Sequence, residues 1–453
     1  MGSPVPGRVR VGYAVGDLGI SIAYFAFGFF FLFYLTDLVG LAPSVAGTVV
    51  LIGKLWDGVN DPLIGMLCDR TRSRHGRKRV YLLYGAVPFG ASFVVLWMIP
   101  PGAPVGATVS LAVVLVLLFA TTYSAVGVPY QALVPVITAD YDERTRLVGF
   151  KAVFSAVGAV LGGAIALVVS ERVDVQTALR VMAVMFGIAV VVTVLLAAQA
   201  VRGASHADEY PIAPVPLSHY MRLLTEPSVA VLMGYKVLGA IATGVLTAAL
   251  PFFALHVVGS ASVSTISLAI YTVVGAALVP TWVRLTRDHD KRRLVLVANI
   301  AASAVLVGIA LLSASGSGLV LLVGSVLLGA AMSAYLVIPP SLVPDLVDWN
   351  EYETGERHES VFFGLWMTVH QLGLGVAGFL LGLALEWFGY VEAAESQPAS
   401  AVLGVRMAFG VIPAVFLVAA AVLLQRYRIT RERLAIAQAS LAQPPVETEA
   451  SAS

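Results

Sequence analysis

Long apolar segments recur along the whole chain, separated by stretches rich in Gly, Pro or charged residues. Each is roughly 20 residues long, the length of a helix that crosses a hydrocarbon core about 30 Å thick. Hydrophobic residues make up 58% of the 453 residues and charged residues only 12%, which is beyond what a soluble core requires. The sequence therefore predicts an all-α polytopic membrane protein.

Twelve such segments divide the chain into two similar parts. The polar stretch 201–227 separates them six and six, and we interpret it as a cytoplasmic linker between an N-terminal half, 1–200, and a C-terminal half, 228–428. Residues 429–453 are rich in Ala, Gln, Glu and Pro, which favours a disordered cytoplasmic tail. The expected spans are 12–35, 44–68, 80–99, 106–131, 147–169, 178–200, 228–254, 262–284, 293–313, 317–338, 361–385 and 403–425.

Basic residues collect in alternate loops. Six lie in 70–79 alone, further groups follow the eighth and twelfth spans, and Arg8 and Arg10 precede the first. The positive-inside rule places these segments in the cytoplasm. We therefore expect both termini to be cytoplasmic, in a bacterial inner membrane.

Three charged residues interrupt the second span. Lys54 precedes Asp57 by three residues and Asp61 follows it by four, so all three share one helix face. A charge inside a membrane is costly and usually functional. One positive and two negative groups leave one negative charge, and hard cations prefer such oxygen ligands. The pattern indicates a site for Na⁺ or a proton.

Several motifs resemble one transporter family over nearly all spans. Their order and spacing are typical of the glycoside-pentoside-hexuronide:cation symporters of the major facilitator superfamily. That resemblance implies twelve transmembrane helices in two six-helix halves, with the substrate site between the halves. The motifs are Gly12-Tyr13, Gly16-Asp17, Tyr34-Leu35-Thr36-Asp37, Trp56-Asp57, Asn60-Asp61-Pro62, Asp69-Arg70-Thr71, Gly76-Arg77, Pro129-Tyr130, Leu133-Val134-Pro135, Asp345-Leu346, Asp348, Thr354-Gly355-Glu356-Arg357 and His358-Glu359.

The resemblance implies that Asp57 and Asp61 bind the coupling cation, helped by a hydroxyl on the fourth span, where Ser124 stands. Lys54 then balances the charge of the site. An alternative is that Lys54 and Asp57 form only a buried ion pair and that Asp61 is a helix-terminal residue before Pro62. An unpaired Asp61 in the membrane argues against it.

The substrate site departs from the family pattern. Acidic residues that bind sugar hydroxyls in the melibiose permease correspond to Ser21 and Gly127, and a lysine on the eleventh span aligns with Gln371. Aromatic residues, including Phe27, Trp97 and Tyr130, suit a ligand with apolar faces, although they equally suit helix packing. A lone histidine is also commonly an interior residue. The candidate substrate-binding residues are Asp17, Ser21, Tyr24, Tyr123, Gly127, Trp366, His370 and Gln371.

Charged residues at the cytoplasmic ends are candidates for gating. Pairs that form between the halves in one state and break in the other would bias alternating access. The basic run also fits an ordinary solvated loop, and Lys151 fits an interfacial lysine. The gating candidates are Asp69, Arg70, Arg77, Lys151, Asp345, Asp348, Arg357 and Glu359.

Small residues lie about one helical turn apart on the fifth and eleventh spans. They allow close approach of helices in lipid, either within a moving interface or in static packing. These residues are Ser155, Gly158 and Gly162 on the fifth span and Gly375, Gly378 and Gly382 on the eleventh.

The motifs of enzymes and ATPases are missing from the sequence. We therefore expect a monomeric secondary transporter that couples Na⁺ or H⁺ to a small glycoside-like or amphiphilic solute. It needs no cofactor and no other metal, and its partners are the solute and membrane lipid rather than nucleic acid. The alternatives are a proton-driven exporter of an amphiphilic metabolite or drug and a non-transporting receptor or scaffold.

Overall fold

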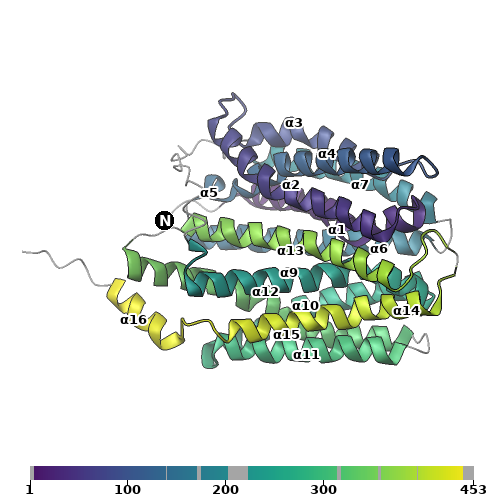
Figure 1. The fold of residues 1–453 in the computed structure, drawn as a ribbon. Coiled ribbons are helices and arrows are strands. Elements are labelled where there is room, and N and C mark those ends of the chain that lie inside the picture. Colours follow the sequence, from purple (N-terminus) through teal and green to yellow (C-terminus); the bar gives the residue numbers. More distant parts are fainter. Residues whose placement is uncertain are drawn as a thin grey trace, which may run out of the picture.

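The computed structural model describes residues 5–138, 140–170, 175–202, 223–313, 318–355, 359–394 and 396–441. The chain forms long helices that run side by side in one bundle (Figure 1). This arrangement confirms the expected all-α fold class. The long helices are α1 (Gly7–Phe33), α2 (Pro43–Arg70), α3 (Arg79–Leu96), α4 (Val105–Gln131), α6 (Tyr141–Ser170), α7 (Val175–Ala200), α9 (Pro227–Phe253), α10 (Ala261–Asp288), α11 (Lys291–Leu312), α12 (Gly318–Thr354), α13 (Glu359–Trp387) and α15 (Ile412–Leu424).

Shorter elements continue or join these helices. The π-helical turns η1 (Tyr34–Leu38) and η2 (Ala254–Val258) extend α1 and α9, and α14 (Ala399–Arg406) leads through η4 (Met407–Val411) into α15. Two further short helices are α5 (Val134–Ile137) and α16 (Arg431–Leu441).

Within the described residues, eleven helical segments are long and apolar enough to cross a membrane. They match eleven of the twelve expected spans. The remaining one is α2, which has 28 residues and lies among the other helices (Figure 1). Its inward charges, including Lys54 and Asp57, interrupt the apolar run.

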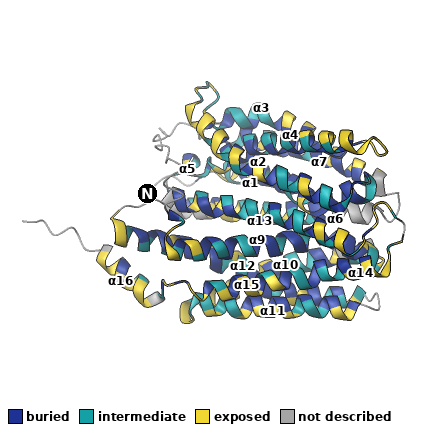
Figure 2. Cartoon of the chain, viewed as in Figure 1, coloured by how far each residue is buried: buried dark blue, intermediate teal, exposed yellow. Residues whose placement is uncertain are grey.

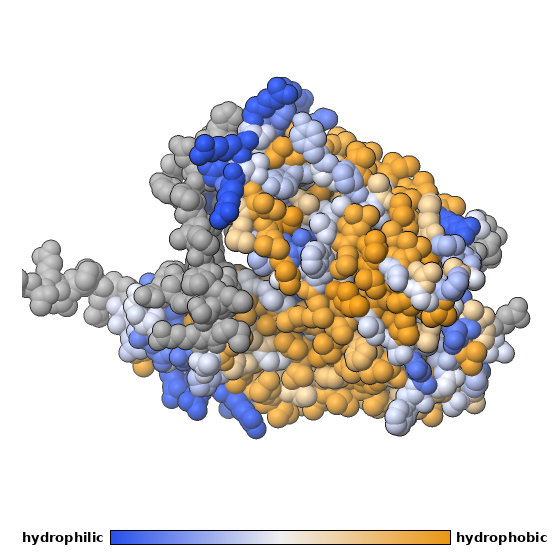
Figure 3. All heavy atoms as spheres, turned by 45° about the horizontal axis from the view of Figure 1, so that its top comes forward, coloured by the Kyte–Doolittle hydropathy of each residue, from blue (hydrophilic) through white to orange (hydrophobic). Residues whose placement is uncertain are grey.

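The outer surface is apolar around the middle of the bundle. Figure 2 shows exposed residues along the outer faces of the helices, and Figure 3 shows hydrophobic side chains across the middle with hydrophilic ones toward the ends. Val153, for example, is 62% exposed and Ile188 is 60% exposed. An exposed apolar surface of this extent is stable only in contact with lipid, so the protein is integral to a membrane.

The helices group into two halves that meet along matching pairs. In the N-terminal half α1 packs on α6 and α7, while in the C-terminal half α9 packs on α13 and α15. Between the halves, α2 packs on α13, α6 on α10, and α1 on α9. The second helix of each half therefore meets the fifth helix of the other. The linker expected at 201–227 lies mostly in 203–222, outside the described residues.

The helices run between two ends of the bundle, which we call the terminus end and the distal end. The terminus end holds Gly7, where α1 begins, and Leu424, where α15 ends. The distal end holds η1, η2 and the segment after α13, which includes Tyr390.

Helix α12 is longer than expected. It continues to Thr354 through Pro339, Pro340 and Pro344, so Asp345 and Asp348 lie on a helix rather than in a loop. Each proline removes only one backbone donor. Four buried apolar residues in and after this proline segment pack into the core of the C-terminal half and hold the extension: Leu342, Val343, Leu346 and Val347.

Part of the expected disordered tail is helical. Helix α16 begins at Arg431, its Leu434 packs against the core of the C-terminal half, and its Ala437 is buried. Gln438 Nε2 donates to Asp348 Oδ2 at 2.9 Å. These tertiary contacts order a segment whose composition favoured disorder. Residues 442–453 lie outside the described residues.

The two groups of small residues serve different contacts. Gly158 and Gly162 bring α6 against the backbone of α1 within the N-terminal half, and Ser155 Oγ lies 2.8 Å from Ser21 Oγ. Gly375, Gly378 and Gly382 instead bring α13 against α2 of the other half. Only the α13 group therefore lies between the halves.

Gly47 offers a test of this close approach. A Cβ atom there would lie 2.6 Å from the Gly378 carbonyl oxygen, so Gly47→Ala should separate α2 from α13 and destabilise the protein by about 1–3 kcal/mol. The measurement is the melting temperature of the purified protein in detergent. Gly28→Ala is the control, because nothing lies within 4 Å of that position. Equal melting temperatures for the two variants would contradict the packing described.

Candidate functional site

The charged cluster on α2 lies inside the bundle. Lys54 Nζ is 2.9 Å from Asp57 Oδ2, and both residues are buried. The ammonium also lies 5.0 Å from the centre of the Tyr24 ring and 5.5 Å from that of Phe27. The helical spacing thus produces the predicted pair, and aromatic faces from α1 surround its positive member.

Asp61 is bonded across to α4. Its Oδ1 accepts a hydrogen bond from Ser124 Oγ, so the hydroxyl expected from the sequence does lie beside it. The second oxygen of Asp57, Oδ1, is buried without a hydrogen-bond partner. Asn60 Nδ2 on the same helix is likewise unpartnered. The cluster therefore contains a buried oxygen and a buried nitrogen that have no hydrogen-bond partner among the described side chains.

A small cavity adjoins this cluster. It lies between α1, α2 and α4, so a cation entering it meets the Asp57 carboxylate and the aromatic rings. Its lining residues are Tyr24, Phe27, Gly53, Lys54, Asp57, Val116, Phe119, Ala120 and Tyr123.

Asp17, which is buried, and the partly buried Lys151 form a second ion pair between α1 and α6. Lys151 Nζ is 3.6 Å from Asp17 Oδ1 and 5.6 Å from the centre of the Tyr130 ring. Ser21 Oγ donates to Asp17 Oδ2 at 3.4 Å. Lys151 was expected at a gate or at the lipid interface, but its ammonium neutralises an aspartate inside the N-terminal half.

The other N-terminal candidates divide into cavity and packing residues. Tyr24 and Tyr123 stack at 5.8 Å beside the cavity, and a Cβ on Gly127 would meet the Tyr123 ring at 3.8 Å. Tyr130 instead stacks on Tyr13 at 4.6 Å, and Trp97 is fully buried. The packing interpretation therefore holds for Tyr130 and Trp97.

A lysine in the C-terminal half was missed in the sequence. Lys236 on α9 is 7% exposed, and its Nζ lies 4.6 Å from the centre of the Trp366 ring and 5.2 Å from that of Tyr335. On α13, His370 Nδ1 and Gln371 Oε1 are buried without hydrogen-bond partners. The signal was available, because a lysine in the middle of an apolar span is itself unusual.

The expected gate at the terminus end is only partly described. Asp345 forms an ion pair of 2.6 Å with Lys291 of its own half, and Asp348 accepts from Gln438. Asp69 and Arg70 lie in the last turn of α2, and Arg77 lies in the following turn. Arg357 and the side chain of Glu359 fall outside the described residues. In this conformation Asp345 pairs within its own half, and its pairing across the halves in another state stays a prediction.

Another ion cluster ties α1 to α6 at the terminus end. Arg10 Nη2 and Arg146 Nη1 each lie 2.9 Å from a Glu143 oxygen. Burial would raise the pKa of Glu143, but hydrogen bonds from Arg10 and the Val5 amide outweigh it and hold that pKa below its usual value.

The distal end carries a cluster that joins the halves. Tyr390 Oη donates to Asp37 Oδ1 at 2.7 Å and lies 2.8 Å from His256 Nε2. Asp37 comes from η1 of the N-terminal half, whereas His256 and Tyr390 belong to the other half. Ser44 N donates to Glu386 Oε2 nearby at 3.1 Å. We call Asp37, His256 and Tyr390 the distal cluster.

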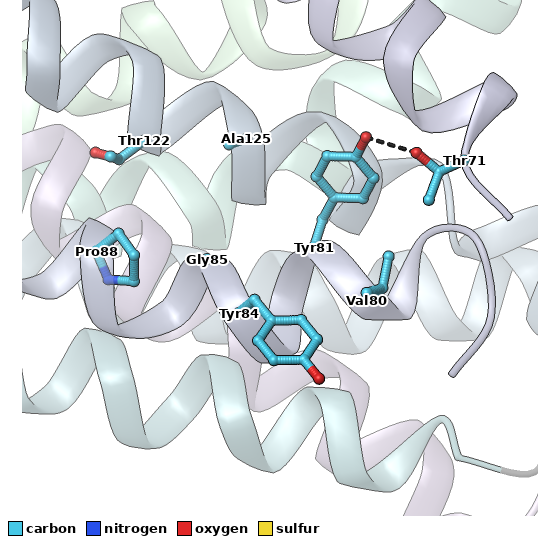
Figure 4. A pocket seen from close by; sticks show the side chains of 8 residues that line it. All are labelled: Thr71, Val80, Tyr81, Tyr84, Gly85, Pro88, Thr122 and Ala125. Carbon is cyan, nitrogen blue, oxygen red and sulfur yellow. Dashed lines mark hydrogen bonds between the residues drawn. The ribbon is translucent and has the colours of Figure 1, made fainter. Parts of the chain in front are cut away.

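A hollow between α2, α3 and α4 lies on the outer face. Tyr84 there is 66% exposed, and the Tyr81 and Thr71 hydroxyls lie 2.8 Å apart (Figure 4). No ionisable Asp, Glu, Lys, Arg or His lines it in the described structure. A lipid-facing hollow of this kind is not the charged site within the bundle.

Residues 12–431 match the family described as MFS/sugar transport protein. The chain belongs to this family. It is therefore a membrane transporter and not an enzyme, as the sequence predicted.

Named relatives cover almost the same length. The chain is 26% identical to the putative glycoside/cation symporter YagG of Escherichia coli, over 94% of this chain and 92% of that protein. It is 25% identical to the isoprimeverose transporter of Lactiplantibacillus pentosus, over 94% and 90%. It is 23% identical to the sodium-dependent lysophosphatidylcholine symporter 1-B of Danio rerio, over 93% and 87%.

Solved structures share the fold. The nucleoside transporter NupG superposes with a TM-score of 0.64 at 12% identity, covering 93% of this chain and 99% of NupG. At that identity the likeness concerns the fold alone.

The distal cluster generates a prediction about conformation. Tyr390→Phe removes both hydrogen bonds of the hydroxyl, each worth roughly 0.5–1.5 kcal/mol, and should favour opening of the distal end. A cysteine at Ser44, in a Cys68→Ser background, should then react several times faster with an impermeant maleimide. Trp387→Phe is the control, because this distal side chain is 88% exposed. Unchanged labelling in Tyr390→Phe would show that the cluster does not hold the halves together.

Proposed function

We propose that this protein is a cation-coupled transporter that moves a small organic solute by alternating access. The cation, Na⁺ or H⁺, binds between Asp57, Asp61 and Ser124. The observation that carries the proposal is the buried, unpartnered Asp57 Oδ1 beside a second carboxylate. The names of the relatives, which include a glycoside/cation symporter and a sodium-dependent symporter, support the same conclusion.

The charge of the cluster explains why a cation is needed. Lys54 contributes one positive charge, while Asp57 and Asp61 contribute two negative charges, which leaves a net charge of −1. An isolated carboxylate inside the bundle is costly. A proton or a Na⁺ ion removes that charge, and carboxylate and hydroxyl oxygens are the ligands that Na⁺, as a hard cation, prefers.

The arrangement of the halves supports alternating access. Contacts between the halves at the distal end include the distal cluster and the edge-to-face pair of Phe33 and Phe252, whose centres are 5.3 Å apart. With this end held closed, solute exchanges through the terminus end, which we place in the cytoplasm from the distribution of basic residues. Opening the distal end then requires breaking hydrogen bonds to Tyr390 and separating α2 from α13.

Cation binding is tested by thermal stability. Na⁺ in place of choline, or a fall in pH without Na⁺, should raise the melting temperature of the wild type, because a ligand that binds the folded state stabilises it. Asp57→Asn and Asp61→Asn each remove a ligand charge and should weaken the response at least about tenfold, or about 1.4 kcal/mol. Ser124→Ala should weaken it less, since one hydrogen bond is worth about 0.5–1.5 kcal/mol.

The control is Glu432→Gln, which removes an exposed carboxylate on α16. It should respond to cations as the wild type does. Wild-type responses in both aspartate variants, or no response of the wild type to either Na⁺ or pH, would refute the cation site.

A further inference from the structure

Lys236 differs from Lys54, the other buried lysine described, and from the partly buried Lys151. Lys54 lies against Asp57 and Lys151 against Asp17, whereas the ion pairs of the described residues include none for Lys236. Its Nζ contacts the Tyr335 hydroxyl at 3.5 Å and the faces of Trp366 and Tyr335. This ammonium is therefore taken out of water without a counter-charge from the described side chains.

Aromatic faces alone do not balance such a charge. Cation–π contacts are individually weak, while removing an ammonium from water costs several times as much. A packing role would be better filled by Met or Leu, which have no charge to desolvate. A functional role for the ammonium, such as binding a negatively charged group, would explain why the protein bears the free-energy cost of burying it.

Polar atoms without hydrogen-bond partners lie on α13, which packs against α9, the helix that carries Lys236. His370 Nδ1 and Gln371 Oε1 on α13 are buried and have unused hydrogen-bonding capacity. About one turn further along α13, a Cβ on Gly375 would meet Lys54 Cβ at 2.8 Å, so this helix lies directly beside the charged cluster of the other half. The flat faces of Trp366 and Tyr335 lie beside the ammonium and suit the apolar face of a ring.

We propose that Lys236 binds the anionic group of the transported solute, which is a small organic anion. The singly charged carboxylate or sulfate of that solute lies on Lys236, and its sugar or apolar portion lies against Trp366 and Tyr335. This inference rests on the transport function proposed above and adds the class of solute.

The charges of the two halves predict how transport of the cation is coupled to transport of the anion. The α2 cluster carries a net charge of −1, and Lys236 carries +1 in the C-terminal half. One monovalent cation and one monovalent anion neutralise both sites together. The two sites together then carry no net charge when both are empty or both are filled. When only the cation or only the anion is bound, the two sites carry a net charge of +1 or −1. Cation and anion therefore cross together, and the transport cycle is electroneutral.

The test compares solutes that differ in charge. Purified full-length protein is melted with p-nitrophenyl β-glucuronide or its neutral match, p-nitrophenyl β-glucoside, and with phenyl sulfate as a further monovalent anion. Each is measured with and without Na⁺, at two pH values. We expect at least one anionic probe to raise the melting temperature of the wild type and the glucoside to have at most a tenth of that affinity.

Variants of Lys236 separate binding from folding. Lys236→Met should weaken the anion response at least tenfold while retaining the response to Na⁺ or H⁺, and Lys236→Arg should restore most of it. Without ligand, Lys236→Met should melt no lower than the wild type, because it removes a buried unpaired charge. Arg72→Met, which removes an exposed positive charge just after α2, is the control and should behave as the wild type.

Three results would overturn the proposal: no anionic probe stabilises the wild type, the glucoside binds as tightly as the anions, or Lys236→Met binds the anions as the wild type does. In each case a cation response that depends on Asp57 and Asp61 would leave the proposed transport function standing. Loss of the cation response as well would refute both.

Discussion

Charge burial on α2 sets the conditions for the rest of the molecule. Lys54 and Asp57 neutralise each other at 2.9 Å, and Ser124 from α4 satisfies one oxygen of Asp61. The charged face of this helix cannot face lipid, so it turns into the bundle, where α2 packs against α4 and α13. The same helix thus carries the proposed cation site and half of the interface between the two halves. Occupation of the site and movement of the interface are physically linked through it.

The interface itself combines close packing with a few polar contacts. Glycines on α13 allow its backbone to approach α2, and a Cβ on Gly47 would already meet the Gly378 carbonyl. At the distal end, Asp37 is bonded to Tyr390 of the other half. These contacts are specific enough to hold one arrangement and few enough to break, which suits a protein that alternates between two states.

Local patterns predicted the α2 cluster well, and long-range contacts were predicted poorly. Lys54, Asp57 and Asp61 lie within eight residues, so helical periodicity alone places them on one face. The family resemblance supplied Ser124. By contrast, Asp37 and Tyr390 are 353 residues apart, and nothing in their neighbourhoods indicates that they meet. Lys236 was visible as an isolated charge, but its lack of a carboxylate partner could be recognised only once the surrounding helices were in place.

The sequence by itself determined the membrane setting, the order of the long helices and the charge of the α2 cluster, because hydropathy and helical periodicity are properties of neighbouring residues. The tertiary structure decided which charged and polar side chains form ion pairs and hydrogen bonds with one another. It paired Lys151 with Asp17 and Asp345 with Lys291, extended α12 through three prolines, and ordered α16 against the C-terminal half. These outcomes depend on which helices pack side by side and on which end of the bundle is closed, and neither is encoded in any single segment.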